Sequence, residues 1–418
     1  MGSPSSSRHN GARSKGRKHL TSTELAAIPD LRTYHDDPLF SLVVRRGIPG
    51  WQLFFLCLTL FLFSKAIFAL WCGVLTVKGL GPALAADLFH YPGIASIAGK
   101  FVAPMHIHGA TVAAVPYLRD YSEILLMITV SAQMVLMRSL WYRLSVALPT
   151  LYDQRVLNPK CISIKQLTDL TNRYNGFLKV TYWGPLSIAL GALLAAGTYY
   201  SAWNHGIYAV LNPENDAFWS ATAYLNWWAN PVKHEALFLW AFAVAVFICY
   251  YMIRNNIVGI AAVLLCRDLF STTGSEREPI LRININHEDD IGGLGVIRDI
   301  VRLGYFSVLN SIIALYLVWC CFGLGRFVIP LFIAFWLLNP IYALVPMILI
   351  RKQIRYSKSF ELEKLTRRPT GRAKRLAREV KALPELLFSP SKISEFIVSQ
   401  VFTAVLFVHF WINARPSQ

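Results

Sequence analysis

Long apolar stretches alternate with polar connections along the chain from residue 51 onward. A helix needs about 20 mainly apolar residues to cross the hydrocarbon core of a bilayer. The stretches that meet this requirement are residues 51–77, 121–141, 182–203, 236–257, 306–324 and 327–350. Aromatic residues stand at many of their ends, as in the interfacial belts of membrane helices. The pattern therefore predicts an all-α fold, a polytopic bundle of transmembrane helices.

A seventh stretch, residues 393–412, has the right length but is less apolar, because it contains Glu395, Gln400 and His409. If it crosses the membrane, the C-terminus lies outside and the bundle has seven spans. If it lies in the interface or lines a central pathway, the bundle has six full spans. We favour seven, because little positive charge follows this stretch whereas the preceding segment, 351–392, is strongly basic.

Lysine and arginine concentrate in alternate connections. Residues 1–50 carry eight, 138–182 seven, 254–303 six and 351–392 thirteen, whereas 78–119 carry three and 203–235 carry one. Loops that stay in the cytosol are enriched in Lys and Arg, because moving cations across the membrane is opposed during insertion. The alternation predicts an integral protein of the plasma (inner) membrane with a cytoplasmic N-terminus.

The composition narrows the possible partners. The chain is 55% hydrophobic and 16% charged, with a formal net charge of +17, whereas a soluble chain carries about a quarter charged residues. In a soluble protein, such a positive charge would suggest nucleic acid. Here the cations lie in the expected cytoplasmic loops, where the anionic inner leaflet of the bilayer is the simpler partner. We therefore expect no nucleic-acid binding, and the sequence indicates no particular cofactor.

The chain divides into a disordered basic tail with a pre-membrane segment (1–50), a six-span bundle (51–350), a basic cytoplasmic helix (351–392) and a seventh span or interfacial helix (393–418). The connections 138–182, 254–305 and 351–392 are long for loops and have helical composition with few turn signals. We expect helices that project beyond the bilayer and pack into an intracellular layer.

The most distinctive local string precedes the fifth expected span. Its candidate residues are His287, Glu288, Asp289, Asp290, Gly292 and Gly293. The imidazole and carboxylates could bind a divalent cation, and catalysis on a lipid or phosphate substrate is a further alternative. A third interpretation is structural: an aspartate caps the following helix, and the glycines form the turn before it with positive φ.

This string resembles an HPDxxGGLG signature of uncharacterised bacterial polytopic membrane proteins. The matching residues are His287, Asp289, Gly292, Gly293, Leu294 and Gly295, and Glu288 stands where the signature has proline. The resemblance implies a prokaryotic membrane protein and brings no established activity with it.

Lys65 lies near the middle of the first expected span. An ionisable group at bilayer depth is costly and marks a functional site by default. Glu123 and Glu395 are the candidate partners that the sequence offers. The alternative is structural: the span is tilted, or Lys65 faces a polar bundle interior and satisfies a carbonyl group.

The external segment 203–235 combines aromatic rings with acids and amides. Its candidate residues are Glu214, Asp216, Trp219, Tyr224, Trp227 and Trp228. Aromatic residues at such a position anchor an interfacial helix. Alternatively, they line an external vestibule in which ring faces hold a cation, while the two acids raise the local cation concentration.

Gln400, Thr403 and His409 recur at spacings of three and six, which places them roughly on one helical face. A polar stripe on an apolar helix either joins helices together or lines a water-filled path. In topology and length the chain is similar to gustatory-receptor-like channels. We therefore expect a homo-oligomeric ion channel, gated by a cytoplasmic or external ligand, with the last helix lining the pore. The alternatives are a membrane enzyme or bacterial effector acting at residues 287–290, and a secondary transporter.

Overall fold

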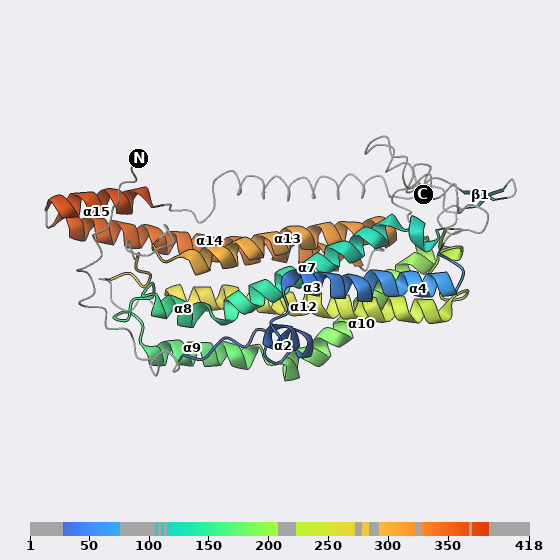
Figure 1. The fold of residues 1–418 in the computed structure, drawn as a ribbon, viewed down its shortest axis with the longest axis horizontal. Coiled ribbons are helices and arrows are strands. Elements are labelled where there is room, and N and C mark those ends of the chain that lie inside the picture. The colour runs from blue at the N-terminus through green and yellow to red at the C-terminus, as the bar shows by residue number, and fades with distance from the viewer. Residues whose placement is uncertain are drawn as a thin grey trace, which may run out of the picture.

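The computed structural model describes residues 28–75, 105–107, 110–112, 115–207, 223–271, 278–283, 292–322, 328–367 and 370–383. The helices are α2 (Pro38–Arg45), α3 (Gly50–Leu58), the π-helical turn η1 (Thr59–Phe63), α4 (Ser64–Trp71), the 3-10 turn η2 (Tyr117–Arg119), α7 (Tyr121–Ser145), α8 (Ala147–Asp153), α9 (Ile164–Phe177), α10 (Val180–His205), α12 (Glu235–Ser271), α13 (Gly295–Phe322), α14 (Val328–Thr366) and α15 (Gly371–Ala382). Two short antiparallel strands, β1 (Met105–Ile107) and β2 (Ala110–Val112), pair with each other. The helices form one elongated bundle (Figure 1), which confirms the predicted all-α polytopic fold.

Among the described residues, five helical segments are long and apolar enough to cross a membrane. They are Gly50–Trp71, Tyr121–Ser145, Ile164–Asn204, Glu235–Phe270 and Gly295–Trp319. Each overlaps one of the first five expected spans, and α14 overlaps the sixth. The expected seventh span, 393–412, lies outside the described residues, so the choice between six and seven spans stays a prediction.

Large apolar side chains face outward on the first span and on α10. Trp71 is 82% exposed and Leu193 is 68% exposed, values that a helix in water would rarely combine with such high hydropathy. Extensive exposed apolar surface marks contact with lipid or protein. The exposed faces and the helix lengths together identify an integral membrane protein.

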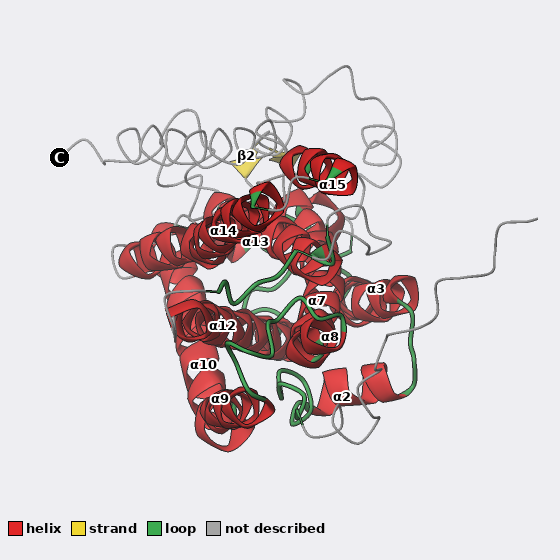
Figure 2. Ribbon diagram, turned by 90° about the vertical axis from the view of Figure 1, so that its left-hand side faces the viewer, coloured by secondary structure: helices red, strands yellow, loops and turns green. Residues whose placement is uncertain are grey.

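Helix α7 is the core element of the bundle. In the apolar stretch of α7, 44% of the residues are buried, whereas 22–33% are buried in the other four spans. It packs against α3, α12 and α13, and the end-on view shows it among these helices (Figure 2). Side chains of α7 therefore meet residues from most of the bundle.

The helical connections expected from composition are present. Helices α8, α9 and α15 and the extensions of α12 and α14 gather at one end of the bundle, the left-hand end in Figure 1. We call this the basic end, because Lys and Arg concentrate there, and we call the opposite end the aromatic end, after Trp227 and Trp228. At the basic end α15 buries Val380 against α14, and Lys358 Nζ donates to Leu383 O at 2.7 Å. The cytoplasmic placement of this end stays a prediction.

Residues 28–49, which the sequence assigns to the end of the basic tail and to the pre-membrane segment, are packed on the bundle. Asp37 caps α2 by accepting from Phe40 N at 2.8 Å, and it also accepts from Tyr251 OH on α12 at 3.1 Å. Phe40 and Val43 are fully buried. Apolar residues spaced along one face of α2 explain this order, and residues 1–27 lie outside the described part of the chain.

Two connections at the basic end join each other through their backbones. Leu157, between α8 and α9, forms an isolated antiparallel bridge with Leu281, between α12 and α13. The amide of Arg282 donates to Val156 O at 2.7 Å. These backbone bonds join the α8–α9 connection to the segment 278–283 that follows α12.

Glu278 is the charged centre of this junction. Its carboxylate accepts from Asn158 Nδ2 at 3.0 Å, from Lys160 Nζ at 3.2 Å and from Arg282 Nη2 at 3.0 Å. The hydrogen bonds from Asn158 and Lys160, with the nearby charges of Lys160 and Arg282, lower the pKa of Glu278 to about 2. Since its ordinary pKa is 4.5, folding favours the ionised form.

We expect this junction to loosen in acid. A folded-state pKa of about 2 below an ordinary value of 4.5 stabilises the fold fully above pH 4.5, and this contribution is lost as the pH falls toward 2. Hydrogen exchange at the Arg282 amide, corrected for the intrinsic rate, should show constant protection above pH 4.5 and declining protection below it. Glu278→Gln should remove this pH dependence; unchanged dependence in the variant would assign it to another group.

Candidate functional site

A cavity of about 130 Å³ lies inside the bundle near the aromatic end, among α4, α7, α10, α12 and α13. The residues that line it are Lys65, Glu123, Leu126, Met127, Val130, Leu194, Ala195, Thr198, Tyr199, Ala245, Ile248, Cys249, Met252, Ala314, Leu315, Val318 and Phe322. Most of these side chains are apolar. A largely apolar cavity with a few polar groups is the usual form of a small-molecule site.

The cavity wall contains a buried ion pair between Lys65 and Glu123. Lys65 Nζ donates to Glu123 Oε1 and lies 3.5 Å from Met127 Sδ. Lys65 is 2% exposed and Glu123 is 7% exposed. Of the two partners that the sequence offers, Glu123 is therefore confirmed, and Glu395 lies outside the described residues. Two charges removed from solvent are retained only when paired, so the pair sets the polarity of the cavity wall.

A π-helical turn, η1, ends two residues before Lys65. The buried positions of the first span are Leu53, Cys57, Phe61, Lys65 and Ala69, which recur every four residues. In an α-helix, each residue four positions further along is rotated by about 40° around the helix axis, so side chains with this spacing gradually leave a single face. The wider turn of η1 reduces this rotation. The local geometry thus keeps Lys65 on the face that meets α7.

Another part of the cavity wall depends on a close approach of α10 and α12. A Cβ atom at Gly191 would lie 3.2 Å from both Tyr250 N and Val246 O on α12. Small residues permit such close helix packing in membranes. The contact fixes the spacing of the two helices that supply Leu194, Thr198 and Cys249 to the cavity.

Asp120 holds the aromatic end of the bundle together. It is fully buried, and its Oδ2 accepts from Trp227 Nε1 at 2.8 Å and from Trp228 Nε1 at 2.7 Å. Its Oδ1 caps α7 by accepting from Glu123 N at 3.1 Å. We call Asp120, Trp227 and Trp228 the aspartate–tryptophan lock. Tyr117 packs edge-on against Trp228, with ring centroids 4.9 Å apart.

The lock is continuous with the cavity through packed rings. Tyr199 and Phe322 line the cavity, and their ring centroids lie 5.6 Å apart. Trp227 of the lock lies 5.9 Å from the Tyr199 ring and 5.8 Å from the Phe322 ring. A change in the cavity that moves the ring of Tyr199 or Phe322 therefore alters the packing of Trp227.

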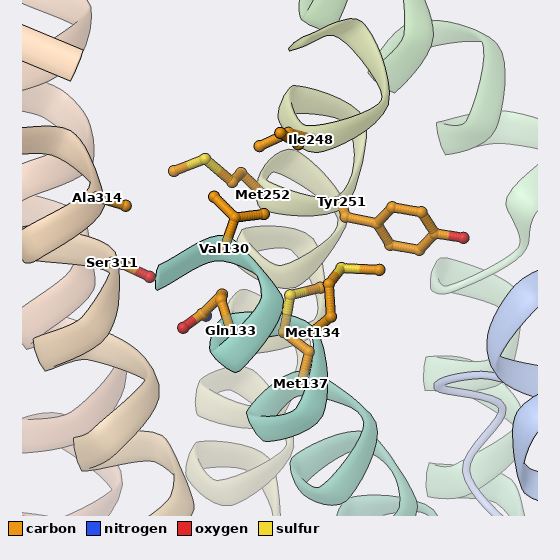
Figure 3. A pocket seen from close by; sticks show the side chains of 9 residues that line it. All are labelled: Val130, Gln133, Met134, Met137, Ile248, Tyr251, Met252, Ser311 and Ala314. Atoms are coloured by element: carbon orange, nitrogen blue, oxygen red, sulfur yellow. The ribbon is translucent and has the colours of Figure 1, made fainter. Parts of the chain in front are cut away.

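Toward the basic end, a polar network joins α7 to α13. Gln133 Nε2 donates to Ser307 Oγ at 2.7 Å, and Asn310 Nδ2 donates to Gln133 Oε1 at 3.0 Å. A pocket of about 10 Å³ lies beside Gln133 and Ser311 (Figure 3), enough for one water molecule. Met134 and Met137 are almost fully buried beside it, so the bundle is closely packed at this level.

The structure gives a partial account of the residues singled out in the sequence. Tyr224, Trp227 and Trp228 are 7%, 2% and 1% exposed, so their rings are enclosed by protein rather than lining an open vestibule. Gly292 and Gly293 have φ values of 72° and 89° and precede α13, which matches the turn expected there.

Several predicted site residues lie outside the described part of the chain. They are Glu214, Asp216, Trp219, His287, Glu288, Asp289, Asp290, Gln400, Thr403 and His409. Their roles in a vestibule, a ligand or metal loop and a pore stay predictions. The described residues contain no group of three or more metal-ligating side chains.

Sequence reasoning missed Asp120, although a signal for it is present. Asp120 stands three residues before Glu123 at the start of an apolar run, which is the spacing of a helix N-terminal capping box. The pattern predicts a cap but cannot reveal that the same carboxylate binds two distant indoles. Comparisons with protein families, with curated proteins and with solved structures find no match for this chain.

Proposed function

We propose that this protein is a homo-oligomeric, ligand-gated ion channel whose ligand binds in the 130 Å³ cavity. The observation that carries the proposal is the cavity itself, a largely apolar space between helices with a buried ion pair in its wall. Bilayer-depth charges mark functional sites by default, and concave apolar spaces with few polar groups are where small ligands bind.

Gating in this proposal follows the packed rings. A ligand in the cavity touches Tyr199 and Phe322, which pack on Trp227, and Trp227 is bonded to Asp120 at the start of α7. Because a ligand shifts an equilibrium only by binding one arrangement better than another, the open state is the one whose ring positions give the ligand its better fit.

Conduction is assigned to surfaces between copies of the chain. Met134, Met137 and Trp141 are at most 2% exposed and fill the core on the side of the cavity toward the basic end, so the interior of one copy is closely packed there. The polar stripe of residues 393–412 supplies a pore lining, with the N-terminus in the cytoplasm as the charge pattern predicts.

Recordings from the full-length protein in liposomes test the proposal. We expect discrete conductance and an assembly of more than one copy in mild detergent. Leu194→Phe, which fills the cavity, should change the open probability, whereas Leu193→Phe on the lipid-facing side should leave it unchanged. A monomer without conductance in the presence of small neutral, cationic and anionic compounds would refute the channel.

A secondary transporter is the second candidate, favoured by the buried Lys65–Glu123 pair, because charged relays inside the membrane are typical of coupled transport. Transport would appear as saturable uptake that follows an ion gradient without discrete current steps. Such uptake, lost in Glu123→Gln and kept in the exposed-site variant Lys352→Met, would replace the channel proposal.

A further inference from the structure

We infer that the cavity takes a neutral, ring-sized, mainly apolar molecule that carries a hydrogen-bonding group. The inference rests on the proposed function, since it names the class of ligand for the same cavity. Three properties of the described residues lead to it: the volume of the cavity, the chemistry of its lining and the balance of charge in its wall.

The volume sets the size of the ligand. The cavity measures about 130 Å³, close to the engineered apolar cavity of about 150 Å³ that stays dry and binds benzene. A six-membered ring with one small substituent fills such a space. Whole lipids and peptides are larger than this space.

The lining sets its polarity. Apolar side chains from four helices surround the space, with Leu126, Ile248 and Leu315 among them. Polar groups border it at Lys65, Glu123, Thr198 and Tyr199. A molecule with an apolar body and one polar group at the ion-pair side therefore matches the lining better than a polar molecule or a plain hydrocarbon.

The ion pair sets its charge. Lys65 and Glu123 cancel each other, so a neutral ligand leaves the cavity balanced. A charged ligand would bring an uncompensated charge into a low-dielectric space, at a large cost. The ammonium of Lys65 has three donors, and among the described residues it contacts Glu123 Oε1 and Met127 Sδ. A ligand hydroxyl can accept from this ammonium while it donates to the carboxylate.

The test compares three probes that share a fluorophenyl ring and differ in charge, by fluorine NMR: 4-fluorophenol, 4-fluorobenzoate and 4-fluorobenzylammonium. Each is titrated against the purified full-length protein in detergent, and unlabelled phenol displaces specific binding from partition into the micelle. We expect saturable binding of 4-fluorophenol, and binding of both charged probes weaker by at least about tenfold, as for other mismatches in apolar pockets.

Matched variants place the binding in the cavity. Leu194→Phe fills the space and should weaken 4-fluorophenol binding at least about tenfold, whereas Leu193→Phe, on the exposed neighbour, should not change it. Ala314→Val adds less volume to the cavity than Leu194→Phe does. It replaces Leu194→Phe in the binding test if that variant fails to fold. Full affinity in every folded cavity-filling variant, or equal affinity for a charged probe, would overturn the inference.

The outcome also separates this inference from the channel proposal. If 4-fluorophenol binds in the cavity but the protein shows no conductance, the inference on the ligand class is supported and the channel proposal is refuted. If a conductance responds to other compounds while 4-fluorophenol does not bind, the channel stands and the ligand class is wrong.

Discussion

Lys65→Met should lower the free energy of unfolding by about 3–5 kcal/mol, because it leaves the Glu123 carboxylate buried without its cationic partner. Unfolding in mixed micelles, followed by circular dichroism, measures the change. The variant Lys352→Met, at an exposed position of α14, is the control and should stay within about 0.5 kcal/mol of the parent.

The double variant Lys65→Met/Glu123→Leu makes this prediction specific. Replacing both charges with apolar side chains of similar volume is often neutral or stabilising, so the double variant should recover most of the stability lost in either single variant. The difference in a double-mutant cycle isolates the pair. Losses that simply add would mean that Lys65 and Glu123 act separately.

Asp120→Ala should lower the free energy of unfolding by about 3–7 kcal/mol, because it removes the acceptor of both indoles in the aspartate–tryptophan lock and the cap of α7. Each buried donor left without an acceptor costs about 1–3 kcal/mol, and loss of an N-cap costs about 1 kcal/mol. Tryptophan fluorescence should shift to longer wavelength as Trp227 and Trp228 become hydrated.

Asp120→Asn is the graded control for this second prediction. The side-chain oxygen of asparagine can still accept a hydrogen bond, so Asp120→Asn should lower the free energy of unfolding less than Asp120→Ala does. Asp36→Ala, at an exposed neighbour of α2, should stay within about 0.5 kcal/mol of the parent. An alanine variant at position 120 as stable as the parent would show that the lock contributes nothing to the fold.

The Lys65–Glu123 pair and the aspartate–tryptophan lock are neighbours at the start of α7. Glu123 bonds Lys65 through its side chain and Asp120 through its backbone amide. The first turn of α7 therefore holds both the ion pair of the cavity and the lock at the aromatic end. In the proposed channel, this proximity would couple the occupancy of the cavity to the position of α7.

Much of the fold was predictable because bilayer crossing is a local requirement. The length and hydropathy of a segment decide whether it can span, and these are properties of consecutive residues. Each of the first five expected spans overlaps one of the membrane-length helical segments of the structure. The order of residues 28–49 was missed, because their burial depends on contact with α7 and α12 rather than on their own composition.

The sequence by itself determined the all-α polytopic class, the helical nature of the long connections and the presence of an unusual charge at Lys65. Only the tertiary structure showed that Glu123 pairs with that charge and that a cavity lies beside the pair. It also joined Asp120 to Trp227 and Trp228, more than 100 positions away along the chain. The physical reason is that helix formation in a membrane satisfies the backbone within each segment. Partners, cavities and locks arise between segments, where packing selects among contacts that no stretch of consecutive residues encodes.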